Sequence, residues 1–108
     1  MTEALYPTAS KSFSDKRREL TPDAEASFRA FSQAVFQDGA LPRKTKELIA
    51  IAVAHVTQCP YCIRGHTKTA LKQGATQAEI LEAIWVAAEM RAGGAVAHSA
   101  IALKEFGE

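Results

Sequence analysis

The most informative part of the sequence reads Gln58-Cys59-Pro60-Tyr61-Cys62-Ile63-Arg64-Gly65-His66. It holds the two cysteines of the chain in a Cys-x-x-Cys spacing, and His66 follows the second cysteine by four residues. Pro60 has a fixed φ and no amide hydrogen, so it suits the first turn of a helix. We therefore predict that Cys59 caps a helix and that Cys62 lies in its first turn.

This placement favours redox chemistry at the two sulfurs. The unpaired amides and the positive end of a helix dipole stabilise a thiolate, and Cys-x-x-Cys thiols at helix starts have pKa values from ~3.5 to ~7.5. His66 lies one turn past Cys62, with the two Cβ atoms ~5–6 Å apart on one face. An imidazole there can accept the thiol proton. Cysteines three residues apart can also form a disulfide. The pattern therefore predicts a site that alternates between the reduced dithiol and the oxidised disulfide.

The composition and charge of the chain bear on where it is found in the cell and on which classes of partner to expect. The 108 residues carry 13 basic and 12 acidic side chains, a formal charge of +1, which gives no reason to expect a nucleic-acid or membrane partner. No segment resembles a signal peptide, and no apolar run reaches the ~18 residues of a membrane span. We expect a cytoplasmic protein, in which two close cysteines are more often catalytic or metal-binding than structural.

The hydrophobic pattern predicts an all-α fold of about five to six helices, since no segment alternates with period two. Residues 1–20 are polar and mixed and are expected to form a partly ordered arm, followed by one helical domain over residues 21–108. The expected helices run from Thr21-Pro22 to Gly39, from Leu41-Pro42 to about His55, from Pro60 to about Gln73, from the capping box Thr76-Glu79 to a break at Gly93-Gly94, and from about Ala95 to Phe106.

Two of these helices are apolar on more than one face. Residues 48–54 form an apolar run in one of them, and residues 80–88 form a similar run in the other. A helix that is apolar on all sides is stable only when other parts of the protein pack against each of its faces. We therefore expect part of this surface to be buried against other copies of the chain. The aromatic stripe that contains Phe28 and Phe31 is expected to lie in the core, and Trp85 in the core or an interface.

The spacing of the polar residues resembles that of a known family. Glu47 is followed by eleven residues, then by Cys59-Pro60-Tyr61-Cys62, then by three residues and His66. This pattern resembles the AhpD-like alkylhydroperoxidase core of the carboxymuconolactone decarboxylase superfamily, roughly over Leu41 to Leu103. The resemblance implies an all-helical fold that assembles as trimers or hexamers and reduces hydroperoxides through its thiols.

The resemblance also implies roles for single residues. Cys62 would be the peroxidatic thiol, Cys59 the resolving thiol, and Glu47 with His66 the proton relay. A lipoyl group or a thioredoxin-like protein would supply the reducing dithiol, and no metal, flavin or haem would be needed. Tyr61 departs from the pattern, because the peroxidase that gives the family its name has a histidine between its cysteines.

Other readings of the same residues stay open. The cysteines could bind a metal, with Glu47, His55 or His98 as further ligands, although zinc sites usually take four ligands from two knuckles. The chain could belong to the decarboxylase branch, whose chemistry does not call for a vicinal dithiol. It could also be a non-catalytic, oligomeric redox sensor. His55 could line the pocket with Tyr61, or a helix carbonyl could satisfy it.

Overall fold

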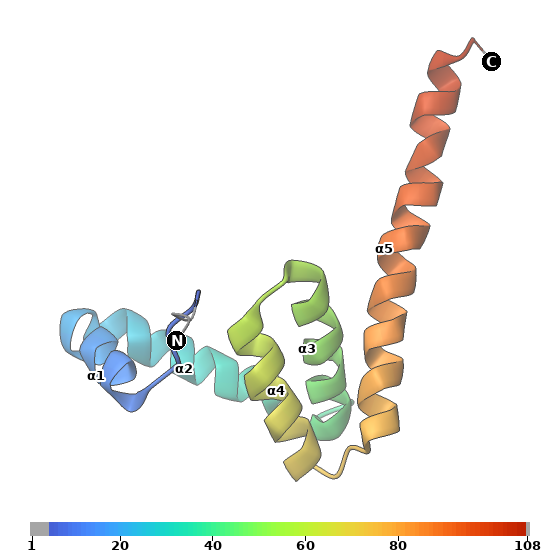
Figure 1. The fold of residues 1–108 in the computed structure, drawn as a ribbon. Coiled ribbons are helices and arrows are strands. Elements are labelled where there is room, and N and C mark those ends of the chain that lie inside the picture. The colour runs from blue at the N-terminus through green and yellow to red at the C-terminus, as the bar shows by residue number, and fades with distance from the viewer. Residues whose placement is uncertain (1–4, 108) are drawn as a thin grey trace. The chain divides into compact units, whose positions relative to one another are not determined.

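A computed structural model describes residues 5–107 of the chain, and Figure 1 shows it as a ribbon. The described residues form helices and connecting turns and contain no strand. The helices are α1 Lys11–Leu20, α2 Pro22–Phe36, α3 Arg43–Thr57, α4 Pro60–Lys72 and α5 Gln77–Glu105. The all-α prediction is confirmed.

The helices differ from the predicted ones at both ends of the chain. We expected a break at Gly93-Gly94, but α5 continues through both glycines for 29 residues. That prediction is wrong because a helical glycine costs only about 1 kcal/mol relative to alanine, and the alanine-rich flanks favour continuing the helix. At the other end, Lys11–Leu20 forms α1 where an arm was expected. The part of that arm at residues 1–4 lies outside the described residues.

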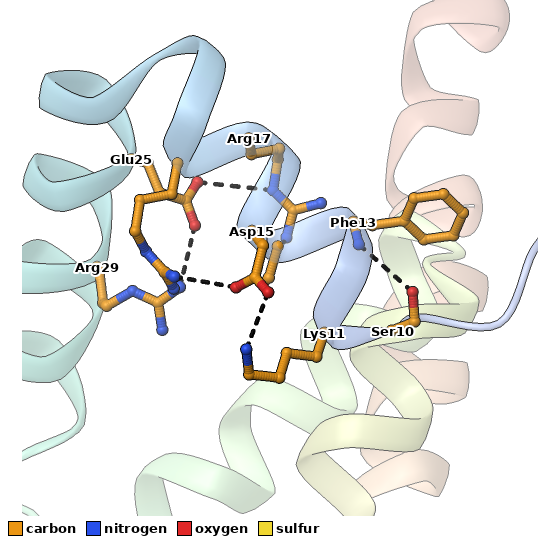
Figure 2. Close-up of polar contacts among 9 residues, drawn as sticks. Ser10, Lys11, Phe13, Asp15, Arg17, Glu25 and Arg29 are labelled. Atoms are coloured by element: carbon orange, nitrogen blue, oxygen red, sulfur yellow. Dashed lines mark hydrogen bonds and ion pairs between the residues drawn. The ribbon is translucent and has the colours of Figure 1, made fainter.

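Helix α1 is held by local polar contacts (Figure 2). Ser10 caps it by accepting a hydrogen bond from the Phe13 amide. Asp15 pairs with Lys11 at 2.9 Å and with Arg18 at 3.1 Å, and all three side chains are well exposed. The link to α2 is the ion pair between Arg17 Nε and Glu25 Oε2 at 3.6 Å. Exposed pairs contribute ~0–1 kcal/mol each, so α1 rests on local contacts rather than on a core.

Thr21 joins α1 to α2. Its hydroxyl donates to the Arg17 carbonyl at 2.8 Å and so satisfies the end of α1. Its side chain makes no cap hydrogen bond to α2, which begins with Pro22 at its first position. The aromatic stripe of α2 is exposed, with Phe28 at 68% and Phe31 at 65%, so the prediction that it lies in the core is wrong for the single chain.

Contacts divide the chain into two compact units, with the division between Gln37 and Asp38. In the second unit, α3 packs against both α4 and α5. Its core is formed by Ile51, Ala70, Ala75 and Ile80, with Leu48 and Ile84 packed against them. Two of these residues are alanines, so the helices can approach closely.

Polar contacts also join α5 to α3. Lys44 Nζ pairs with Glu79 Oε2 at 2.9 Å, and Arg91 Nη1 donates to the Val56 carbonyl at 2.9 Å. The C-terminal part of α5 extends past the ends of α3 and α4 (Figure 1). Within residues 5–107, no helix combines the length and the apolar character that crossing a bilayer requires.

Candidate functional site

The turn between α3 and α4 presents the two cysteines. Gln58 ends α3 in the left-handed region, at φ 59°, and the Cys59 amide donates back to the Ala54 carbonyl at 3.1 Å. Cys59 then caps α4, because its Sγ accepts a hydrogen bond from the Cys62 amide at 3.2 Å. The predicted cap and helix start are confirmed. Cys59 and Cys62, both half-buried, are joined as a disulfide.

A carboxylate–imidazole pair connects α3 to α4. Glu47 is only 2% exposed, and its Oε1 lies 2.7 Å from His66 Nδ1 although the two residues are 19 apart in sequence. A carboxylate can only accept, so we assign the proton to Nδ1. The neutral ring then carries its lone pair on Nε2, the atom that can take a proton from a thiol.

His66 and Cys62 lie four residues apart on α4. Residues at this spacing share one face of a helix, with Cβ atoms ~5–6 Å apart. The side chain that Glu47 holds therefore belongs to the face that carries Cys62. Glu47 on α3 is thus hydrogen-bonded to His66 on α4, and His66 shares a helix face with Cys62. Cys62 is in turn joined to Cys59 by the disulfide.

Arg43 is a further charged group at this site, and it was not among the residues predicted from the sequence. Its Nε lies 3.7 Å from Glu47 Oε2, so the two oxygens of Glu47 face different partners. A buried carboxylate needs such compensation, since an unpaired one is costly to bury. The spacing of four residues on one helix is a signal that could have revealed this pair.

Arg91 was also missed, and no local pattern could have revealed it. Its hydrogen bond to Val56 spans 35 residues and ends just before the turn that carries Cys59. The bond satisfies one of the carbonyls left unpaired at the end of α3. Arg91 thereby ties α5 to the segment that leads into the disulfide.

A shallow, open depression of about 400 Å³ lies at this turn and is lined by His55, Gln58, Pro60, Ile63 and Arg64. His55, for which the sequence left open a pocket position or a contact with a helix carbonyl, is one of these lining residues. Its Nδ1 donates to the Ile51 carbonyl at 2.7 Å. Tyr61 lies in the first turn of α4, is 38% exposed, and is not among the residues that line the depression.

The residues suggested as further metal ligands lie in different surroundings. His98 Nδ1 donates to the Gly94 carbonyl at 2.8 Å on the exposed part of α5. Glu47 is engaged by His66 and Arg43. Across residues 5–107, no three or more His, Cys, Asp or Glu side chains come together in a group suited to a metal ion.

Comparison with known proteins identifies the family. Residues 22–105 match the Carboxymuconolactone decarboxylase family. The chain belongs to the carboxymuconolactone decarboxylase family. The match covers α2 to α5 and confirms the resemblance drawn from Glu47, the cysteines and His66.

Individual relatives are found both by sequence and by structure. A protein of Paracoccus denitrificans, named uncharacterized protein 4 in cox locus, is 53% identical over all of this chain and 96% of its own length. A crystal structure of an apo carboxymuconolactone decarboxylase family protein from Legionella pneumophila is 42% identical, with a TM-score of 0.69, over 85% of this chain and 82% of that one.

A third family member carries a functional suggestion. It is a carboxymuconolactone decarboxylase family protein from Thermotoga maritima, for which a part in the antioxidative response has been suggested. It is 35% identical to this chain, with a TM-score of 0.57, over 71% of each chain.

Proposed function

We propose that this carboxymuconolactone decarboxylase family member is a thiol-dependent peroxidase, or disulfide oxidoreductase, that reduces hydroperoxides through Cys59 and Cys62. The observation that carries the proposal is the 2.7 Å hydrogen bond between Glu47 and His66. It holds an imidazole on the helix that carries both sulfurs, with its basic nitrogen oriented by a buried carboxylate. This is the arrangement by which a base activates a nucleophile.

The oxidative half of the cycle has two steps. His66 takes the Cys62 proton, and the thiolate attacks the O–O bond of the hydroperoxide, forming a sulfenic acid and releasing an alkoxide that takes up the proton. The Cys59 thiol then attacks the sulfenic sulfur, which forms the disulfide and releases water. The structure has the cysteines in this disulfide state.

The reductive half needs an external dithiol. One of its thiolates attacks the disulfide, and its second thiol resolves the mixed disulfide, which leaves Cys59 and Cys62 reduced and the reductant oxidised. A lipoyl group or a thioredoxin-like protein fits this role. The Cys62 amide that donates to Cys59 Sγ also stabilises a thiolate on Cys59 when that sulfur is the leaving group. We place this cycle in the cytoplasm, where dithiol reductants are available.

The proposal is tested by peroxide consumption with a dithiol reductant. We expect turnover in the wild type and its loss in Cys62→Ser. Cys59→Ser should turn over more slowly than wild type, because the external dithiol itself must then reduce the Cys62 sulfenic acid. Wild-type turnover in both variants would contradict the scheme. Mass measurement of the disulfide after a single peroxide addition verifies that the same sulfurs react.

The same experiment separates an enzyme from a redox sensor. A sensor consumes about one peroxide per disulfide and changes its assembly or partner when oxidised. An enzyme consumes many equivalents at constant mass. Counting equivalents while following the mass by light scattering distinguishes the two functions.

We also propose that the chain acts as a homo-oligomer, such as a trimer or hexamer. Support comes from large apolar side chains that are exposed in the single chain on α3 and α5, which include Ile49, Val53, Trp85, Val86, Met90 and Val96. A large number of exposed apolar side chains is typical of surfaces that bind other chains.

A further inference from the structure

The depression beside the disulfide contains a cation that no other group neutralises. Among residues 5–107, the Arg64 guanidinium has neither a hydrogen-bond partner nor an ion-pair partner. Most arginines elsewhere in the described chain are paired, as Arg17, Arg18 and Arg29 are. A guanidinium presents a planar fork of donors that matches a carboxylate.

His55 adds a second polar group to the same depression. Because its Nδ1–H is used by the Ile51 carbonyl, the neutral ring presents Nε2 as its remaining polar atom, and the ring has one fixed orientation. When protonated, it adds a second positive charge. Within the part of the chain that the structure describes, no acidic side chain lines the depression.

The rest of the lining is apolar and lies next to the sulfurs along the chain. Pro60 directly follows Cys59, and Ile63 directly follows Cys62. A volume of about 400 Å³ falls in the range of small-molecule sites, about 300–1,000 Å³. A ligand with a short apolar body and one anionic end matches these surfaces.

We propose that this depression binds the carboxylate end of a small aliphatic substrate, with Arg64 and His55 as the residues that set specificity. The inference rests on the proposed function, because it names the substrate class for the same disulfide. The apolar body lies on Pro60 and Ile63. The anionic end can belong to the hydroperoxide or to the reducing dithiol.

Binding is tested first without turnover, using hexanoate and its neutral amide, hexanamide. We expect hexanoate to bind about three- to tenfold more tightly, as a partly exposed charge-assisted contact allows. The NMR signal of the Ile63 methyl group reports binding at this place. Arg64→Gln should abolish the preference. Lys68→Gln is the matched control, because it removes the same charge from the exposed face of α4, one turn beyond the depression.

Two kinetic arms identify the source of the carboxylate. The reductant arm compares dihydrolipoate with dihydrolipoamide, and the oxidant arm compares a medium-chain hydroperoxide ending in a carboxylate with the same compound ending in an amide. A preference for the charged compound in one arm, lost in Arg64→Gln and kept in Lys68→Gln, supports the proposal and assigns the ligand.

Three results would overturn the inference. The first is that hexanoate does not perturb the Ile63 methyl signal, and the second is that Arg64→Gln and Lys68→Gln change hexanoate binding equally. The third is that hexanoate binds but neither kinetic comparison shows a preference for the carboxylate over the amide. Turnover of the two amide compounds does not depend on Arg64. If they react normally while the preference is absent, the inference fails and the peroxidase function stands. If neither the charged compounds nor their amides react, the peroxidase function itself fails.

Discussion

At Glu47, a carboxylate is kept almost fully out of water by contacts from two helices. His66 approaches one oxygen at 2.7 Å and Arg43 faces the other at 3.7 Å. Such a group depends on its partners, because a buried carboxylate that lacks a hydrogen-bond or charge partner is costly. Glu47 therefore connects the stability of the α3–α4 pair to the orientation of the proposed base.

The first prediction concerns the charge of Glu47. Glu47→Gln keeps the shape of the side chain but removes the carboxylate that holds the proton on His66 Nδ1, and we expect peroxide turnover to fall about 10- to 100-fold. Turnover with a dithiol reductant is the measurement, and thermal unfolding checks that the variant is folded. Glu82→Gln removes an exposed carboxylate from α5 and should retain full activity. Undiminished turnover in Glu47→Gln would exclude the relay.

Helix α5 shows how a helix can pass through residues that usually end one. Gly93 and Gly94 lie inside it, and both have ordinary helical φ values. Its start is well defined by the capping box, in which Thr76 accepts from the Glu79 amide and Glu79 accepts from the Thr76 amide. The capping box therefore stabilises the N-terminus of α5, whereas the two glycines lower the helix propensity in its middle.

Replacing Gly94 should strengthen the middle of α5. A Cβ built at Gly94 meets no atom within 4 Å, so Gly94→Ala should raise the free energy of unfolding by about 0.5–1 kcal/mol. Urea denaturation measures the change. Gly93→Ala should gain less, because its Cβ would lie 3.3 Å from Glu89 Oε1. If Gly94→Ala were less stable than wild type, the backbone there would have to contact another chain closely.

The start of α5 should also make stability depend on pH. The hydrogen bond from the Thr76 amide, and then the contact with Lys44, hold the pKa of Glu79 below its usual value of 4.5. Because the folded pKa is the lower one, the unfolded chain binds the proton first as the pH falls. The contribution of Glu79 is complete above about 4.5 and is lost as the pH falls from there through the folded pKa.

Glu79→Gln should therefore flatten the acid side of the stability curve. Denaturant unfolding of wild type and variant is compared at neutral pH and again below the usual carboxyl pKa. We expect the two proteins to differ at neutral pH and to converge in acid. The exposed control Glu82→Gln should run parallel to wild type. A constant difference between wild type and Glu79→Gln at all pH values would show that the Glu79 charge is not involved.

For the whole molecule, the single chain leaves much apolar surface uncovered. Trp85 is 70% exposed and Val96 is 71% exposed, both on α5. The fully buried apolar residues of the described chain are mostly alanines together with Ile51 and Ile80. A core this small gives modest stability, so cover from other copies would add to it.

Trp85 should matter for assembly. Trp85→Lys places a charge on the apolar face of α5, and we expect the mass in solution to fall toward that of one chain. Light scattering at several protein concentrations is the measurement. Glu82→Lys introduces the same residue on the same helix at an already polar position and should leave the mass unchanged. A monomeric wild type would end the oligomer proposal.

The amino-acid sequence by itself determined the helical class, the start of α4 at Pro60, the cap at Cys59 and the box at Thr76 and Glu79. These features depend on short-range geometry, in which a cap or a proline acts on residues within one turn. The sequence pattern also related Glu47 to His66, but only through a family resemblance. Local propensity failed at Lys11–Leu20 and at Gly93-Gly94, where the signals for and against a helix are nearly balanced.

Only the tertiary structure decided which distant side chains meet. The contact of Glu47 with His66, the bond from Arg91 to Val56, and the unpaired position of Arg64 beside His55 all depend on how α3, α4 and α5 pack. Packing is a property of the whole set of apolar side chains, and no window of neighbouring residues contains it. The candidate site residues could therefore be named from the sequence, while the contact of Arg91 and the depression lined by Arg64 and His55 could not.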